Sequence, residues 1–138
     1  MSEMRKGTYA LLVELKKDEE IEVGKLGILS FKKGYYTYIG SAMGGLDGRI
    51  RRHLRKNKKK HWHIDYLLEK GEIIKVLFIE EKKECGIASL LKDEFYGIAG
   101  FGSSDCKCKT HLFYSRGAKA ILDKLRSSGM KNYEAVSH

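Results

Sequence analysis

Proline is absent from all 138 residues of the sequence, so no segment of it is a proline-rich linker. Long apolar runs are absent too: no stretch reaches the roughly 20 residues that a membrane-spanning helix needs. The first residues, MSEMRKGTY, lack the apolar segment of a secretory signal peptide. From these absences we expect a cytoplasmic protein that has no membrane partner.

Cysteine is scarce, and its three residues are an odd number in a chain without a secretory signal. A disulfide framework is therefore not expected. Cys106, Cys108 and His111 have the spacing C-x-C-x-x-H, and Cys85 could supply a fourth ligand for a structural zinc ion. C-x-C fits ordinary zinc spacing less well than C-x-x-C. We therefore expect thiols that brace the loop, in preference to a zinc site.

Positive charge is abundant and concentrated. The chain has 27 Lys and Arg against 18 Asp and Glu, a formal net charge of +9. Eight basic residues lie between Arg49 and Lys60, and no acid lies between Asp47 and Asp65. Such a concentration favours binding to a polyanion, since guanidinium binds phosphate in a bidentate manner; a solvated helix face is the alternative. The expected nucleic-acid contacts in this run are Arg51, Arg52, Arg55, Lys56, Lys58, Lys59 and Lys60.

The hydrophobic pattern predicts one α+β domain over residues 1–126 and a flexible C-terminal tail over 127–138. Strands are expected at 8–15, 21–31, 35–39, 73–80 and 111–114, and the first three as an antiparallel meander. Helices are expected at 46–57, 62–69, 84–96 and 118–125. The predicted fold is a small central antiparallel or mixed β-sheet flanked by helices.

Two tyrosines and one helix carry the candidate catalytic groups. Tyr9 lies in GTY near the start of the first strand, and Tyr38 lies in YIG at the end of the strand predicted at 35–39. The helix that follows carries Arg49 and His53, four residues apart and so on one face. An arginine at this position is well placed to hold a phosphate against the sheet edge. Taken singly, each residue also suits an ordinary packing or surface role.

GTY, YIG and the R-x-x-x-H spacing resemble the signature of the GIY-YIG nucleases, over about residues 7–96. The later segment FGSSDCKCKTHLFY resembles the Uri-type subgroup. The resemblance implies a divalent-metal-dependent endonuclease that hydrolyses phosphodiester bonds, of DNA above all, in repair or processing. It also implies a glutamate that binds Mg²⁺ or Mn²⁺, for which Glu84 is the best match, with Glu80, Glu81 and Glu94 as alternatives.

Within that resemblance, Arg49 would neutralise charge on the phosphoryl oxygens, and Tyr9 or Tyr38 would take a proton from the attacking water. A tyrosine has a pKa of roughly 10, so nearby cations would have to lower it. His53 would orient the water or phosphate, or assist proton transfer. Since Glu84 begins a helix whose apolar stripe follows it, its carboxylate is expected to lie along that stripe and to need a cationic partner.

The sequence departs from the family pattern in two places. An extra strand, predicted at 21–31, separates the two tyrosine motifs, and the family's late asparagine has no clear counterpart, since Asn132 falls in the predicted tail. Trp62, beside the basic run, suits either stacking on an unpaired base or capping of the core. The rival function is a non-catalytic DNA- or RNA-binding module that docks a partner enzyme; a protein partner or second specificity module is compatible with both.

Overall fold

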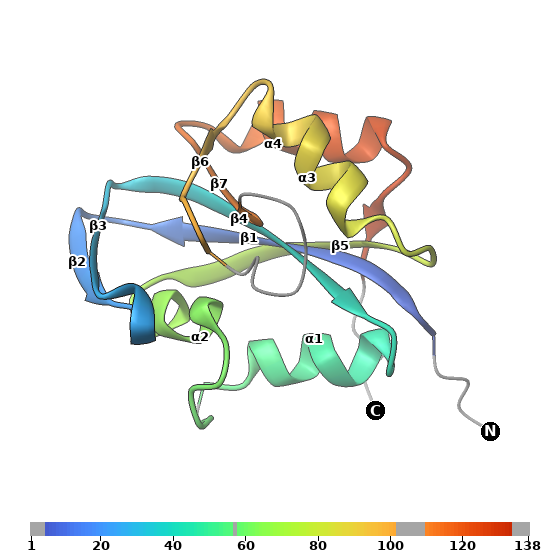
Figure 1. Cartoon of the computed structure of the whole chain (residues 1–138). Helices are drawn as coiled ribbons and strands as arrows, with labels where there is room; N and C mark the ends of the chain where they lie inside the picture. The colour runs from blue at the N-terminus through green and yellow to red at the C-terminus, as the bar shows by residue number, and fades with distance from the viewer. Residues whose placement is uncertain (1–4, 57, 102–109, 134–138) are drawn as a thin grey trace.

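The computed structural model describes residues 5–56, 58–101 and 110–133. In this part of the chain an antiparallel β-sheet lies between two layers of helices, and a small hairpin extends from one end (Figure 1). The predicted α+β class, with a central sheet flanked by helices, is confirmed. None of the helices in these ranges is long and apolar enough to cross a membrane.

The main sheet is built around its first strand. Its order is β6-β7-β4-β1-β5-β8, and every neighbouring pair is antiparallel. Because successive side chains of a strand point to opposite faces, β1 contributes apolar groups to both sides of the sheet. The strands are β1 (Gly7–Leu15), β4 (Gly34–Ala42), β5 (Glu72–Ile79), β6 (Tyr96–Gly97), β7 (Leu112–Ser115) and β8 (Lys131–Asn132).

Each face of the sheet packs against its own pair of helices. On the face of Tyr9 and Leu11 lie α1 (Leu46–Leu54) and α2 (His63–Leu68), whose buried apolar residues belong to one core cluster with those of the sheet. On the opposite face lie α3 (Glu84–Lys92) and α4 (Ala118–Ser127), in a second cluster with Ala10 and Leu12. Full burial of each large apolar side chain contributes about 1.5–3 kcal/mol, so both layers are held by hydrophobic packing.

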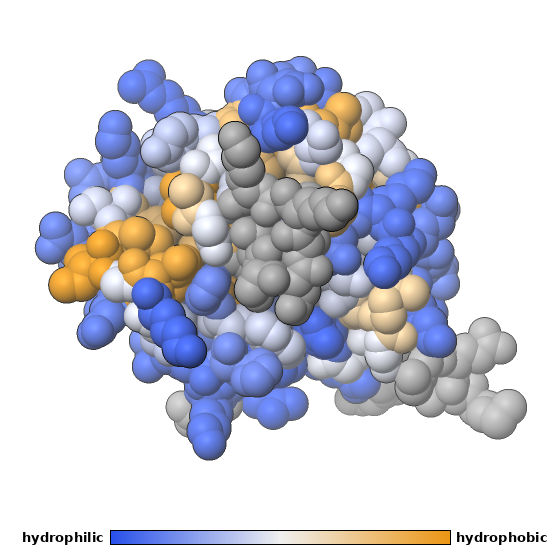
Figure 2. All heavy atoms as spheres, viewed as in Figure 1, coloured by the Kyte–Doolittle hydropathy of each residue, from blue (hydrophilic) through white to orange (hydrophobic). Residues whose placement is uncertain are grey.

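The strand predicted at 21–31 is wrong, and so is the meander. The segment forms β2 (Glu19–Glu22), a short 3-10 helix η1 (Gly24–Leu26) and β3 (Ile28–Phe31). Gly24 and Gly27 have φ of 45° and 80°, a conformation that interrupts an extended run. β2 and β3 pair with each other in a separate sheet, so β1 pairs directly with β4. Figure 2 shows apolar side chains gathered over this hairpin, where Ile28 is 70% exposed.

Two helices are shorter than predicted. α1 ends at Leu54, not near residue 57, because Arg55 has an extended backbone (ψ 129°). The ammonium of Lys58 donates to the carbonyls of His53 and Arg55 and so satisfies groups at this helix end. α3 ends at Lys92, and Tyr96 already belongs to β6.

The predicted C-terminal tail is wrong for its described part, up to residue 133. α4 extends to Ser127, and β8 then pairs with β5, with Asn132 opposite Leu77. The Tyr133 hydroxyl donates to the Asp47 carboxylate over 2.6 Å, and Arg5 donates to the same carboxylate over 2.8 Å. These contacts tie both ends of the described chain to the start of α1. Residues 134–138 lie outside the described ranges.

Thr8 connects β1 to the segment before α3. Its buried hydroxyl donates to the carbonyl of Glu81 over 2.8 Å and accepts from the backbone N–H of Lys83, also over 2.8 Å. The hydroxyl therefore fixes the turn from which Glu84 begins α3. Thr37, on the neighbouring strand β4, is equally buried, but its hydroxyl has no hydrogen-bond partner among the described residues.

These two threonines give a matched pair of stability predictions. Thr8→Val removes both hydrogen bonds and leaves the Glu81 carbonyl and the Lys83 N–H, which are partly buried, without this partner, so we expect it to lower the free energy of unfolding by about 1–3 kcal/mol. Thr37→Val removes a hydroxyl that has no partner, so its unfolding free energy should equal or exceed that of the parent. Urea unfolding of the three proteins measures both effects, and equal losses in the two variants would contradict the prediction.

Candidate active site

Close approaches of neighbouring groups explain the glycines of both tyrosine motifs. Tyr9 lies opposite Gly40 in the β1–β4 register. A Cβ atom at Gly40 would lie 2.3 Å from Cζ of Tyr9 and 2.4 Å from its hydroxyl oxygen, so the tyrosine ring occupies the space of a side chain. A Cβ atom at Gly7 would lie 2.0 Å from the carbonyl oxygen of Ile79 on β5. Both sites therefore require glycine, and together they fix the path of β1 beneath the Tyr9 ring.

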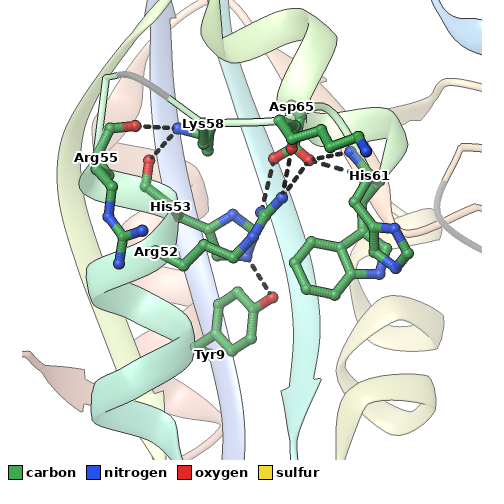
Figure 3. Close-up of polar contacts among 9 residues, drawn as sticks. Tyr9, Arg52, His53, Arg55, Lys58, His61 and Asp65 are labelled. Carbon is green, nitrogen blue, oxygen red and sulfur yellow. Dashed lines mark hydrogen bonds and ion pairs between the residues drawn. The ribbon is translucent and has the colours of Figure 1, made fainter.

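The hydroxyl of Tyr9 forms a buried hydrogen bond with Nε2 of His53, with 2.7 Å between the oxygen and the nitrogen (Figure 3). Tyr9 is 1% exposed and His53 2%. The Tyr38 ring lies beside both, with centroid distances of 6.3 Å to Tyr9 and 6.2 Å to His53. The structure thus brings together three of the predicted catalytic residues, and His53 lies in the interior.

Burial sets the protonation of the two tyrosines. It raises the pKa of Tyr9 to about 12; the positive charge of Arg49 lowers it, but by less. Burial likewise raises the pKa of Tyr38, and the neighbouring Tyr9 raises it further. The expectation that nearby cations would lower a tyrosine pKa is wrong for the protein by itself, because desolvation of the phenolate outweighs the attraction of the arginine.

His53 is held neutral. Burial lowers its pKa to about 4, although the charge of Asp65 acts in the opposite direction. Its Nδ1 atom is buried and has no hydrogen-bond partner among the described residues. The hydrogen bond of the ring is therefore the one between Nε2 and the Tyr9 hydroxyl. A neutral imidazole can either accept the phenolic proton or donate to the phenolic oxygen.

Arg49 lies at the edge of this aromatic cluster. One guanidinium nitrogen, Nη1, donates to the carbonyl of Ser41 on β4 over 3.0 Å, and the guanidinium carbon lies 4.5 Å from the centre of the Trp62 ring. Its side chain is half-buried, and its charge influences both Tyr9 and Tyr38. A cation held in this way has donors left for an anion that approaches the tyrosines.

Glu84 is the first residue of α3 and is half-buried, whereas Ile87, Ala88 and Leu91 of the same helix are buried. The expected position along the buried stripe is therefore only partly correct. Burial is the main cause of the raised pKa of Tyr9 and Tyr38, and the negative charge of Glu84 raises both pKa values further. Glu84 therefore lies within electrostatic range of both tyrosines. Glu84 forms no salt bridge with any described residue.

The other acids predicted as alternatives have ordinary surface positions. Glu81 pairs with Lys83 and Glu94 with Lys124, while Glu80 is exposed. Among the described residues no group of three His, Cys, Asp or Glu side chains could hold a metal ion. A single carboxylate such as Glu84 still suits Mg²⁺, which is commonly bound through one or two carboxylates, waters and substrate phosphates.

The zinc hypothesis falls largely on residues outside the described ranges. Cys106 and Cys108 both lie there, so the structure places neither. Cys85 is exposed on α3, whereas His111 is buried beside β7. Burial lowers the pKa of His111, and the charge of Glu84 opposes that shift.

Asp65 was not among the predicted site residues, although it organises the start of α2. It is 1% exposed and accepts from both terminal nitrogens of Arg52 over 3.0 Å, and from the backbone N–H groups of His61 and Trp62 over 2.8 and 3.0 Å (Figure 3). Burial raises its pKa, but these hydrogen bonds outweigh burial and lower it. The available signal was an acid three residues after the N-cap residue Trp62, and it is the first acid after the basic run.

The predicted nucleic-acid contacts separate into two groups. Some have internal partners: Arg52 pairs with Asp65, Lys60 with Glu69, and Lys58 caps α1. Trp62 is half-buried and packs against the core cluster, as one of its two predicted roles requires. The exposed basic side chains without an ion pair to any described residue are Arg51, Arg55, Lys56 and Lys59. Arg55, Lys56 and Lys58 also line an open groove of about 820 Å³.

The buried imidazole predicts a pH dependence of folding. The pKa of His53 is about 4 in the folded protein against 6.5 for a free histidine, so the unfolded chain binds more protons between these values. The stabilisation is present above about pH 6.5 and is lost as the pH falls towards 4. Relative to His53→Gln, the parent should lose roughly 3 kcal/mol of unfolding free energy over this range.

Urea unfolding of both proteins at several pH values measures that difference. His63 and His111, whose pKa values burial also lowers, are present in both proteins, so their contributions cancel. Parallel pH profiles of the two proteins would contradict the prediction, because they would show that folding does not lower the pKa of His53.

Comparison with known proteins gives one match. A family described as a domain of unknown function, DUF123, matches residues 8–133, which include both motif tyrosines, the basic run and Glu84. No curated protein and no solved structure matches the chain. Since the match covers most of its length, the chain belongs to the DUF123 family.

Proposed function

We propose that this protein is a divalent-metal-dependent endonuclease of the GIY-YIG type, which hydrolyses phosphodiester bonds of nucleic acid. The observation that supports it most directly is the buried hydrogen bond between Tyr9 and His53, with the Arg49 guanidinium at its edge. It joins a proton carrier to a neutral imidazole, beside a cation that suits a phosphate. The GTY and YIG motifs and the spacing of Arg49 and His53 support the same reaction.

The raised pKa of Tyr9 requires that its proton moves in concert with that of the water. As the water oxygen attacks phosphorus, the phenolic oxygen takes a proton from the water while the phenolic proton passes to Nε2 of His53. The P–O bond to the leaving strand then breaks; the leaving oxygen takes a proton from solvent water, and His53 returns its proton to solvent. This relay avoids a free buried phenolate, which a pKa of about 12 disfavours. Burial opposes the imidazolium that forms, since it lowers the pKa of His53 to about 4, and the charge of Asp65 offsets only part of this effect.

Arg49 would bind the phosphoryl oxygens, where charge increases in the transition state. Its hydrogen bond to the carbonyl of Ser41 orients it before substrate arrives. Glu84 would hold a Mg²⁺ or Mn²⁺ ion, which would supply further positive charge to the scissile phosphate. The turn fixed by Thr8 would keep Glu84 at the start of α3 for this purpose.

The exposed basic residues after Arg49 would bind the nucleic-acid backbone. We propose DNA as the substrate, the cytoplasm as the location of the protein, and DNA repair or processing as its role. They also favour a second candidate, a non-catalytic DNA- or RNA-binding module. Arg51, Arg55, Lys56 and Lys59 are exposed and would serve either function. The two candidates differ only in whether Tyr9, His53 and Glu84 perform chemistry.

Salt dependence tests the proposed binding surface. If Arg55 and Lys56 contact phosphates, changing both to Glu should reduce the slope of log K against log salt by about 0.9 per lost contact on duplex DNA. The matched control changes the exposed Lys92 and Lys119, on α3 and α4, to Glu. Fluorescence anisotropy with a labelled duplex gives both slopes, and equal changes in the two double variants would place the binding surface elsewhere.

Cleavage assays test the reaction itself. The parent should nick or cut DNA with Mg²⁺ or Mn²⁺ and do nothing with EDTA. Glu84→Gln keeps the shape of the side chain but removes the charge, so it should abolish turnover while duplex binding persists. Glu81→Gln, three residues earlier on the surface, is the control and should cut like the parent.

The same assay distinguishes the tyrosines. Tyr9→Phe should lower the rate by roughly 10²-fold or more, since it removes the relayed proton, whereas Tyr38→Phe should lower it much less. Substrates should include duplex, single-stranded, branched and lesion-bearing DNA. A parent that binds these substrates but cuts none of them would leave the binding module as the function.

A further inference from the structure

The only tryptophan of the chain lies against two guanidinium groups. The guanidinium carbon of Arg49 is 4.5 Å from the centre of the Trp62 ring, and that of Arg52 is 4.3 Å away. The His53 ring is 5.7 Å from the same indole, centre to centre. Trp62 therefore contacts Arg49 and His53, two of the candidate catalytic residues, although it precedes a different helix.

Asp65 holds this arrangement together. Its carboxylate receives the backbone N–H of Trp62, which fixes the start of α2, and both terminal nitrogens of Arg52, which belongs to α1. One buried carboxylate thus links the two helices on either side of the indole. Because Asp65 occupies the terminal nitrogens of Arg52, this arginine supports the ring. Arg49 instead donates to the carbonyl of Ser41 and lies close enough to the Tyr9 hydroxyl to act on its pKa.

We infer that Trp62 and Asp65 are positioning residues, which hold the Arg49 guanidinium over the indole so that it meets a phosphodiester in the geometry of the transition state. The inference rests on the proposed function and deepens it, since it connects α2 to the phosphate-binding group on α1. A long arginine side chain has many rotamers, and a flat aromatic surface on one side reduces their number before substrate binds.

This role replaces the predicted stacking of Trp62 on an unpaired base. An indole face that carries a guanidinium is not open to a nucleobase, so Trp62 acts on the nucleic acid through Arg49. The expected signature is a fall in kcat with little change in KM, because the lost orientation matters most where charge accumulates.

The first experiment uses the free protein, so it does not depend on nuclease activity. Trp62 is the sole source of tryptophan fluorescence, and acrylamide quenches an indole that it can reach. Arg49→Ala and Arg52→Ala should each raise the quenching constant above that of the parent. Arg51→Ala, which removes an exposed arginine of the same helix, should leave it unchanged.

The second experiment is a double-mutant cycle with the cleavage assay. Trp62→Leu should lower kcat about tenfold, whereas Trp62→Phe, which keeps an aromatic surface, should retain most of the rate. In the Arg49→Ala background, Trp62→Leu should have little further effect, since it acts through that arginine. Tyr66→Leu removes another half-buried aromatic from α2, and its effect should add to that of Arg49→Ala.

Asp65→Asn keeps the shape of the capping group. It should lower kcat and raise the quenching constant, and it replaces Trp62→Leu as the test variant if that protein does not fold. Additive effects of Trp62→Leu and Arg49→Ala, or unchanged quenching in Arg49→Ala, would overturn the inference. A parent that cuts no substrate would overturn the proposed function instead. The quenching constants, which are measured without substrate, then decide the inference by themselves.

Discussion

The contact of the Tyr9 ring with the backbone of Gly40 constrains everything around it. The ring fills the space of a side chain on the neighbouring strand, so β1 and β4 keep one register and the hydroxyl is directed at His53. α1 must then pack on this face of the sheet in a position that allows His53 to hydrogen-bond the Tyr9 hydroxyl. Arg49, one helical turn earlier, therefore lies at the edge of the same cluster. A substitution at position 40 would therefore disturb strand pairing, helix position and chemistry together.

The strands and helices were largely predictable because their apolar residues are periodic. The run TYALLVEL is mostly apolar because β1 is buried on both faces, and α1 repeats Leu46 and Ile50 at helical spacing. The hairpin of β2 and β3 was missed because two glycines with positive φ divide a pattern that otherwise alternates. The C-terminal strand was missed because it is short and polar: its stability comes from pairing with β5 and from the contact of Tyr133 with Asp47.

Sequence spacing identified the candidate site residues but not their electrostatics. Tyr9 and His53 are 44 positions apart, so neither their contact nor the degree of their burial follows from a pattern. The same holds for Arg52, which looks like any other cation of the basic run until Asp65, 13 positions later, is seen to bind it. Desolvation depends on what covers a group, and that cover comes from distant parts of the chain. The raised pKa of Tyr9 was therefore the property of the site that the sequence predicted least well.

The central position of β1 has a consequence for biosynthesis. This strand is made before both of its partners: β4 begins 19 residues after β1 ends, and β5 begins 57 residues after it. Until the later strand is complete, a nearly continuous apolar segment has one edge without hydrogen-bond partners, which is the kind of edge that pairs with other chains. Non-local pairing of this kind also slows folding, since a long loop must close before its contacts form. The residues that place Tyr9 at the centre of the site thus make the nascent chain depend on its later half for protection.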